Sequence, residues 1–325
     1  MQRRKLGYTD VELTTIGLGT WAIGGGEWEF GWGDQDDQAS IATIREALEA
    51  GINWIDTAAA YGFGHAEEVV GKAIKGLGKR PLVATKCSLL NDGHGKVVRS
   101  LKRDSILKEA EDSLRRLQVD VIDIYQIHWP NPEEDIEEAW EAMAELVRQQ
   151  KVRYIGVSNF NVAQMQRIQS IHPIASLQPP YSMLRRQIEA EILPFCAAHN
   201  IGVIVYSPMQ KGLLTGKITP DWVKQLGDND HRKRDPMFNS PQLEINLEFI
   251  AKLKPMADKY HISLATLAVN GVLQQSAVTA AIVGARKPGQ ILDAVRAADV
   301  EIAQQDWDQM NQWLNERDAA VAKVV

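Results

Sequence analysis

The chain has 325 residues, of which 45% are hydrophobic and 24% charged, as in a globular protein with a large core. Its formal net charge of −6 disfavours a nucleic-acid backbone or an anionic membrane as the main partner. Two cysteines are too few for a disulfide framework or a zinc ribbon. Because the N-terminal region has no apolar signal segment and no apolar run reaches ~18 residues, we expect a soluble cytoplasmic protein.

In chain order, short β-branched runs alternate with longer runs of helical period. Residues 3–13 predict a hairpin, and Asn161 with Gln164 predicts the start of a helix. Apolar residues spaced three or four apart predict helices around 41–48, 106–117 and 140–147. Most of the strand candidates are apolar on both faces, as buried parallel strands are. The predicted strands are residues 14–18, 53–56, 82–86, 121–127, 152–158, 175–178, 202–207 and 279–284.

The spacing of these strands predicts the architecture. Most of the first seven begin about 25–40 residues apart, which is the size of a βα unit. Eight such units close into a barrel more naturally than they form an open sheet. We therefore predict an α/β protein: a (β/α)8 TIM barrel with an N-terminal β-hairpin cap and extra C-terminal helices, forming one domain over residues 1–325. The segment 207–241 is predicted to be a long loop that is too polar for the core. Helical patterns follow at 247–260, from 263 and at 307–314.

Four polar residues follow three neighbouring predicted strands. Asp56 ends the second strand and is followed by Tyr61, Lys86 ends the third, and His128 follows the fourth. In a parallel barrel such residues meet at one rim. A nearby lysine ammonium is expected to lower the pKa of a tyrosine, a carboxylate to keep that lysine charged, and an imidazole to orient a carbonyl oxygen. Each residue alone has a structural explanation, but together they predict a proton-donating site.

Several motifs carry a resemblance to a known family. GINWIDTAAAYGFGHAEEVVGKAI, the strand ending at Lys86, YQIHWP and IGVSNF strongly resemble the aldo-keto reductase superfamily, from about Arg4 to about Asp299. GLGTWAIGG, QPPY, GLLTGK and GARKPGQ are similar to a bacterial, NADPH-dependent branch of it. The resemblance implies a (β/α)8 barrel in which NADPH supplies hydride to reduce aldehydes and ketones to alcohols. It also implies that Tyr61 donates the proton, that Lys86 and Asp56 adjust the pKa of Tyr61, and that His128 positions the substrate carbonyl.

The predicted cofactor site follows the later strands. Amide and hydroxyl groups after strands five and six would hold the carboxamide, and the ring of Tyr206 would stack on the nicotinamide. The segment SPMQKGLLTGK offers backbone N–H groups and two lysines for the pyrophosphate. The predicted cofactor-binding residues are Thr20, Trp21, Asp56, Ser158, Asn159, Gln178, Tyr206, Ser207, Pro208, Met209, Gln210, Lys211, Gly212, Lys217, Arg232, Gly284, Ala285, Arg286 and Gln290.

Arg286 bears on the choice between NADPH and NADH. Barrels often bind phosphate at the loops after strands seven and eight, and arginine suits a bidentate phosphate contact. We expect Arg286 to bind the 2′-phosphate, and Arg232 to reach it from the polar segment; the alternative for Arg232 is a solvated charge run. Many family members carry Arg where Gln290 stands and Asn where Ala294 stands. The prediction is therefore a preference for NADPH with some use of NADH.

Aromatic residues Trp21, Trp32 and Trp129 lie in predicted rim loops, where they would wall a pocket for a small carbonyl substrate. No metal site is expected, because the seven histidines are dispersed. The sequence indicates neither the physiological substrate nor the oligomeric state.

Two other functions compete with the reductase. A three-residue match to the dinucleotide motif of open-sheet enzymes, at Gly17, Gly19 and Ala22, is weak because no helical pattern follows it. The other is an NADPH-binding sensory or regulatory barrel, similar to channel-associated β subunits, with little turnover.

Overall fold

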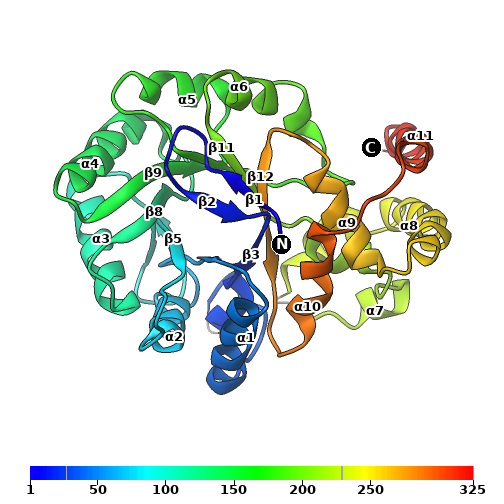
Figure 1. Cartoon of the computed structure of the whole chain (residues 1–325), viewed down its shortest axis with the longest axis horizontal. Helices are drawn as coiled ribbons and strands as arrows, with labels where there is room; N and C mark the ends of the chain where they lie inside the picture. Colours follow the sequence, from blue (N-terminus) through cyan, green and yellow to red (C-terminus); the bar gives the residue numbers. More distant parts are fainter. Residues whose placement is uncertain (27, 228–229, 325) are drawn as a thin grey trace.

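The structure is a computed structural model that describes residues 1–26, 28–227 and 230–324. Eight parallel strands form a closed barrel, in which the last strand returns to the first. Figure 1 shows this barrel with helices around it, which confirms the predicted (β/α)8 fold. In barrel order the strands are β3 (Ile16–Gly19), β4 (Trp54–Asp56), β5 (Leu82–Cys87), β8 (Ile122–Ile127), β9 (Val152–Ser158), β10 (Ser176–Gln178), β11 (Gly202–Val205) and β12 (Val278–Gly284).

The outer helices cover the barrel with the apolar stripes expected from their sequences. Ile44, Ile106 and Trp140 are fully buried in the core between helices and strands. Asn161 and Gln164 form the predicted capping box, each side chain accepting a hydrogen bond from the other residue's backbone N–H. These helices are α1 (Asp37–Glu49), α2 (His65–Ile74), α3 (Arg103–Leu117), α4 (Ile136–Arg148), α5 (Val162–Gln169), α6 (Ile192–Ala198), α9 (Leu264–Leu273) and α10 (Gln290–Val295).

The predicted hairpin closes the amino-terminal end of the barrel. Strands β1 (Arg3–Lys5) and β2 (Glu12–Thr14) pair antiparallel, so Thr14, which we placed in the first barrel strand, pairs instead with Arg3. Leu6 and Leu13 pack against inward-facing barrel residues such as Trp54. The indole of Trp54 crosses the interior so closely that a Cβ on Gly17 would lie 2.1 Å from it. The barrel is therefore filled at this end, and ligands must enter at the other.

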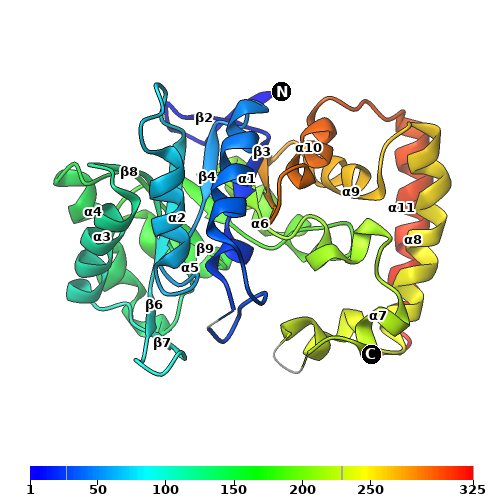
Figure 2. The same ribbon diagram turned by 90° about the horizontal axis from the view of Figure 1, so that it is seen from below.

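Helices α8 (Gln242–Lys259) and α11 (Gln304–Val321) lie side by side outside the barrel, as Figures 1 and 2 show. They enclose a hydrophobic cluster of their own, which includes Phe249, Leu253 and Met310. The predicted extra C-terminal helices are thus confirmed. In the part of the chain that the structure describes, no helix is both long and apolar enough to cross a membrane.

The segment 207–241 differs from the long polar loop that we predicted. It contains the short helices η4 (Gln210–Thr215), α7 (Pro220–Lys224), η5 (His231–Arg234) and η6 (Pro236–Phe238); residues 228–229 lie outside the described residues. Leu213, Leu214 and Phe238 are fully buried in the cluster around α8. The prediction was wrong because these short helices bury isolated apolar side chains, which leave no periodic pattern. The remaining 3₁₀ helices are η1 (Trp21–Gly24), η2 (Glu133–Asp135), η3 (Gln187–Glu189) and η7 (Arg296–Ala298).

Candidate active site

The four predicted catalytic side chains meet at the carboxyl end of the barrel. Lys86 Nζ lies 2.7 Å from Asp56 Oδ1 and donates to the carbonyl oxygen of Thr57 at 2.9 Å. It also lies 3.4 Å from the hydroxyl oxygen of Tyr61. The ring centroids of Tyr61 and His128 are 5.8 Å apart, with the planes nearly perpendicular. The spacing of strands β4, β5 and β8 therefore places a carboxylate, an ammonium, a phenol and an imidazole around one point.

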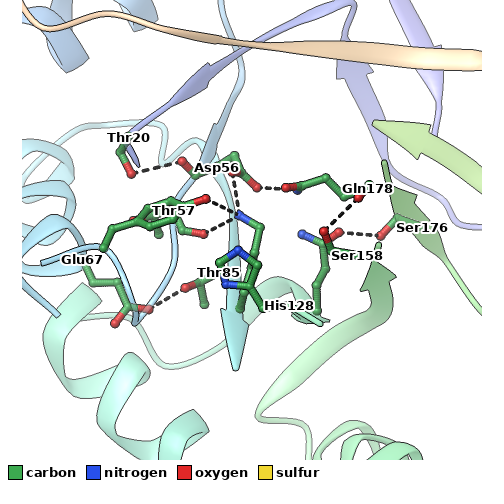
Figure 3. Close-up of polar contacts among 12 residues, drawn as sticks. Thr20, Asp56, Thr57, Glu67, Thr85, His128, Ser158, Ser176 and Gln178 are labelled. Atoms are coloured by element: carbon green, nitrogen blue, oxygen red, sulfur yellow. Dashed lines mark hydrogen bonds and ion pairs between the residues drawn. The ribbon is translucent and has the colours of Figure 1, made fainter. Parts of the chain in front are cut away.

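Asp56 and Lys86 form a buried ion pair. Their exposed fractions are 2% and 1%. Burial raises the pKa of Asp56 and lowers the pKa of Lys86. The charge of Lys86 opposes the rise for Asp56, and the charge of Asp56 opposes the fall for Lys86. The second oxygen of Asp56 accepts a hydrogen bond from Gln178 Nε2 at 2.8 Å, and the backbone carbonyl of Asp56 accepts one from Thr20 Oγ1 at 3.1 Å (Figure 3). These contacts hold the carboxylate, which in turn holds the ammonium beside Tyr61.

The pKa of Tyr61 departs from our expectation. We expected Lys86 to lower it, but burial raises it well above its usual value, and Asp56 and Tyr206 raise it further. The physical reason is that the charge of Lys86 is largely balanced by Asp56, which lies closer to it than Tyr61 does. At neutral pH the phenol therefore keeps its proton, as a group that donates a proton in the reaction must.

His128 is neutral at physiological pH. Burial and the charge of Lys86 lower its pKa well below the usual value for histidine. Among the described residues, no group forms a hydrogen bond with its Nδ1 atom. A neutral imidazole can donate one hydrogen bond, which suits the orientation of a carbonyl oxygen beside Tyr61.

The residues predicted to hold the carboxamide form one network next to His128. The hydroxyl of Ser158 donates to the backbone carbonyl oxygen of Gln178 at 2.8 Å, and the Nδ2 atom of Asn159 donates to the backbone carbonyl oxygen of His128 at 3.0 Å. The hydroxyl of Tyr206 donates to Asn159 Oδ1 at 2.9 Å. This network fixes the orientation of the amide groups and of the Tyr206 ring.

A cavity of about 950 Å³ joins these groups. Thr20, Lys86 and Gln210 do not line it: Thr20 and Lys86 are buried, and Gln210 is buried against Ser182 and Met237. The predicted residues that do line it are Trp21, Trp32, Asp56, Tyr61, His128, Trp129, Ser158, Asn159, Gln178, Tyr206, Ser207, Pro208, Met209, Lys211, Gly212, Lys217, Arg232, Gly284, Ala285, Arg286 and Gln290.

Arg286 lies at one end of this cavity and contacts the loop before α1. Its guanidinium donates to Gln35 Oε1 at 2.7 Å and to the carbonyl oxygens of Trp32 at 3.0 Å and Asp34 at 2.5 Å. Gln290 Oε1 accepts a hydrogen bond from the backbone N–H of Arg286 at 2.7 Å, so Gln290 fixes the start of α10. Three of the five guanidinium N–H groups are used in this way, which leaves two for a ligand.

Arg232 joins the segment 207–241 to the loop before α1. Its guanidinium lies 4.7 Å from the ring centroid of Trp32 and 4.8 Å from that of Trp222, and it forms an ion pair with Asp230 at 2.6 Å. The solvated charge run that we considered for this residue is therefore wrong, because its side chain is mostly buried between two indoles.

Sequence reasoning missed one wall of the cavity. Strands β6 (Leu89–Asn91) and β7 (Val97–Arg99) form a hairpin between β5 and α3, and Leu89, Val97 and Arg99 line the cavity. The signal was present, because Asp92 and Gly93 stand between two short apolar runs, as in a hairpin turn. At the other end of the cavity, Ser263 and Asp293 were also missed.

Comparison with known proteins agrees with this barrel. The aldo/keto reductase family model matches residues 15–315. Aldo-keto reductase YhdN of Bacillus subtilis is 44% identical over 294 residues, which cover 90% of this chain and 87% of that protein. NADH-specific methylglyoxal reductase of Escherichia coli is 37% identical over 320 residues, covering 94% and 96%. The structure of the glycerol dehydrogenase AKR11B4 from Gluconobacter oxydans gives a TM-score of 0.88 at 38% identity, covering 97% of this chain and 95% of that one.

The fold and these similarities define an oxidoreductase of the kind that acts on small carbonyl compounds with a nicotinamide cofactor. The chain belongs to the aldo/keto reductase family.

Proposed function

We propose that this protein reduces aldehydes and ketones to alcohols, with NADPH as the hydride donor and Tyr61 as the proton donor. The observation that carries the proposal is the contact between the protonated phenol of Tyr61 and the ammonium of Lys86, 3.4 Å apart beside a large cavity. The residues of that cavity suit a dinucleotide, since amide groups lie beside His128 and four of the cations that line it, Lys211, Lys217, Arg232 and Arg286, follow β11 and β12.

The chemistry assigned to the protein is proton donation and positioning. NADPH, when bound in this cavity, would supply the hydride for the reduction. Tyr61 gives its proton to the carbonyl oxygen, and Lys86 stabilises the phenolate that remains, because its ammonium lies next to the phenol oxygen. His128 orients the carbonyl oxygen by a hydrogen bond. The rings of Trp21 and Trp28 line the cavity beside Tyr61 and would exclude water from the reacting atoms.

A Tyr61→Phe variant tests this mechanism. The change removes the proton donor and leaves the ring, so we expect a folded protein that still binds NADPH and reduces carbonyl compounds about 10²–10⁴-fold more slowly. Steady-state rates on a panel of aldehydes and ketones, with NADPH and NADH in parallel, give the comparison. A variant as fast as the wild-type protein would exclude Tyr61. Tight NADPH binding by the wild-type protein with no turnover on the panel would instead favour the sensory or regulatory function.

We further propose that NADPH is preferred, with some use of NADH, and that Arg286 supplies the preference. An Arg286→Ala variant should lose most of the difference in kcat/KM between the two cofactors. Because Arg286 also holds the loop before α1, Gln35→Leu is the matched control: it removes the Gln35 contact but keeps the guanidinium. An unchanged NADPH/NADH ratio in Arg286→Ala would contradict the assignment. The measurement is informative because the relative from Escherichia coli is named as NADH-specific.

A location in the cytoplasm and a single-domain organisation over residues 1–325 stay predictions.

A further inference from the structure

We propose that the active-site cavity selects carbonyl compounds that carry a carboxylate remote from the carbonyl group, and that Arg99 binds this carboxylate. The inference rests on the proposed function, because it requires that the reacting carbonyl lies at Tyr61. It names a substrate class for the cavity and a residue that determines specificity.

Arg99 lies on the side of the cavity formed by the β6–β7 hairpin. The hairpin stands at the opposite end of the barrel from β2, as Figure 2 shows. In its ladder Arg99 pairs with Leu89, and both residues line the cavity together with Val97. The cations predicted to contact the nucleotide come from segments that follow β11 and β12 instead. Arg99 is therefore placed to meet the substrate rather than the cofactor.

The charge of Arg99 is not balanced within the described part of the chain. No carboxylate there lies within 4.0 Å of its guanidinium, whereas Lys211 forms an ion pair with Asp235 and Arg232 one with Asp230. A guanidinium that has no carboxylate partner and lies beside a cavity attracts anions.

The carboxylates that line the cavity do not offset this charge. In the residues that the structure describes they are Asp56 and Asp293. Asp56 is paired with Lys86, and Asp293 accepts hydrogen bonds from Ser263 and Thr266. Among the described residues, the substrate side of the cavity therefore combines one unbalanced cation with no unbalanced anion.

The walls near the hairpin define the rest of the substrate. Trp21, Trp28, Phe30 and Trp129 line the cavity with Leu89 and Val97, so this region accepts a flat or apolar body. One guanidinium matches the two oxygens of a carboxylate with two parallel hydrogen bonds. A phosphate dianion would require further cations, which the described residues on this side of the cavity do not supply. The expected substrate is therefore an apolar aldehyde with a carboxylate at its far end.

The hairpin is held in place from its base, so Arg99 does not depend on a loose loop. The backbone N–H of Ser88 donates to Glu109 Oε2 at 2.9 Å, and its carbonyl oxygen accepts a hydrogen bond from the N–H of Ser100 at 3.2 Å. The Ser88 hydroxyl accepts a hydrogen bond from the N–H of Trp129 at 3.4 Å. One residue thus fixes the hairpin to α3 and to the loop that carries Trp129. Such preorganisation reduces the entropy lost when a ligand binds.

The test compares two aldehydes that share the same 4-formylphenyl group, 4-formylbenzoate and its uncharged methyl ester. The wild-type protein should have the higher kcat/KM for the carboxylate, and this ratio should fall as salt is added, because exposed charges are screened. In Arg99→Gln the carboxylate-to-ester ratio should fall about tenfold, through KM, while kcat/KM for the ester stays the same. Lys96→Gln is the matched control: it removes one positive charge from the same hairpin at a residue that does not line the cavity.

Each contrary outcome has a distinct meaning. A ratio unchanged in Arg99→Gln overturns the inference and leaves the proposed function intact. An equal fall in Lys96→Gln also overturns it, because the effect would then be general attraction rather than a contact. If the wild-type protein reduces neither aldehyde with NADPH or NADH, the proposed function fails, and this inference fails with it.

Discussion

Glu109 on α3 is 5% exposed and lies beneath the turn that joins β5 to the β6–β7 hairpin. Its carboxylate accepts hydrogen bonds from the backbone N–H of Ser88 and from the hydroxyl of Ser105, at 2.9 and 3.1 Å. Burial raises its pKa to about 7, although these two hydrogen bonds and the charge of Arg116 oppose the shift. The protonation state of one carboxyl group at the base of the β6–β7 hairpin therefore depends on pH near neutrality.

The raised pKa of Glu109 predicts a change in stability with pH. The unfolded chain has the ordinary glutamate pKa near 4.3, so between that pH and about 7 the folded protein binds the proton more tightly. This contribution to stability is fully present below about 4.3 and is lost as the pH rises to about 7. Between about pH 5 and 7.5 the free energy of unfolding should fall by roughly 2–3 kcal/mol more in the wild-type protein than in Glu109→Gln. Urea titrations at both pH values measure this, and equal changes in the two proteins would refute it.

At the level of elements, the cavity is closed by segments that are distant in sequence. The loop before α1 contacts Arg286 after β12, and it contacts η5 through Arg232, whose guanidinium lies between Trp32 and Trp222. Trp32, Arg232 and Arg286 all line the cavity, so we expect these contacts to lie on the path by which a bound dinucleotide leaves. We therefore expect the short helices η4, α7, η5 and η6 to act as a folded cover, which the contacts of Arg232 help to hold.

An Arg232→Gln variant should release the cofactor faster. Each cation–π contact contributes about 0.5–1 kcal/mol, so losing two of them should speed dissociation about tenfold. Stopped-flow fluorescence with NADPH and NADH measures the rate, and Arg234→Gln, an exposed residue of the same helix, is the control for charge. Faster release of both cofactors would support the contact with the two indoles. Faster release of NADPH alone would instead assign Arg232 to the 2′-phosphate.

At the level of the whole molecule, the chain has two hydrophobic regions with different tasks. The barrel and its helices position the site, while the cluster between α8 and α11 lies beside the barrel and supports the cover. Asn246 on α8 links η6 to α11 within the second region: its Nδ2 donates to the carbonyl oxygen of Met237 in η6, and its Oδ1 accepts from Arg317 on α11. No residue of α11 lines the cavity.

A Met310→Ala variant should separate stability from activity. Met310 is fully buried between α8 and α11, so its truncation should lower the free energy of unfolding by about 2–4 kcal/mol. Turnover of the folded variant below its melting temperature should match the wild-type protein. Met310→Leu, which conserves the volume, should cost less than about 1.5 kcal/mol. A loss of kcat without a loss of stability would show that α11 acts on the site.

The sequence alone was enough to predict the barrel and to predict that its four polar residues lie together. The apolar character of a strand and the periodicity of a helix are local properties of the sequence. Residues at the carboxyl ends of parallel strands lie at the same rim of a barrel, and this does not depend on how the side chains pack. Asp56, Lys86 and His128 could therefore be grouped by their places after β4, β5 and β8, and Tyr61 by its short distance from Asp56 along the chain. The β6–β7 hairpin carried a local signal as well, which was overlooked.

Only the tertiary structure decided the properties that depend on distant contacts. The raised pKa of Tyr61 follows from how deeply the phenol is buried and from the pairing of Lys86 with Asp56. The partners of Arg286 are about 250 residues away in the chain, and the burial of Phe238 depends on α8. Desolvation and pairing depend on which groups surround an atom in space, and the order of residues along the chain does not contain that information until the chain has folded.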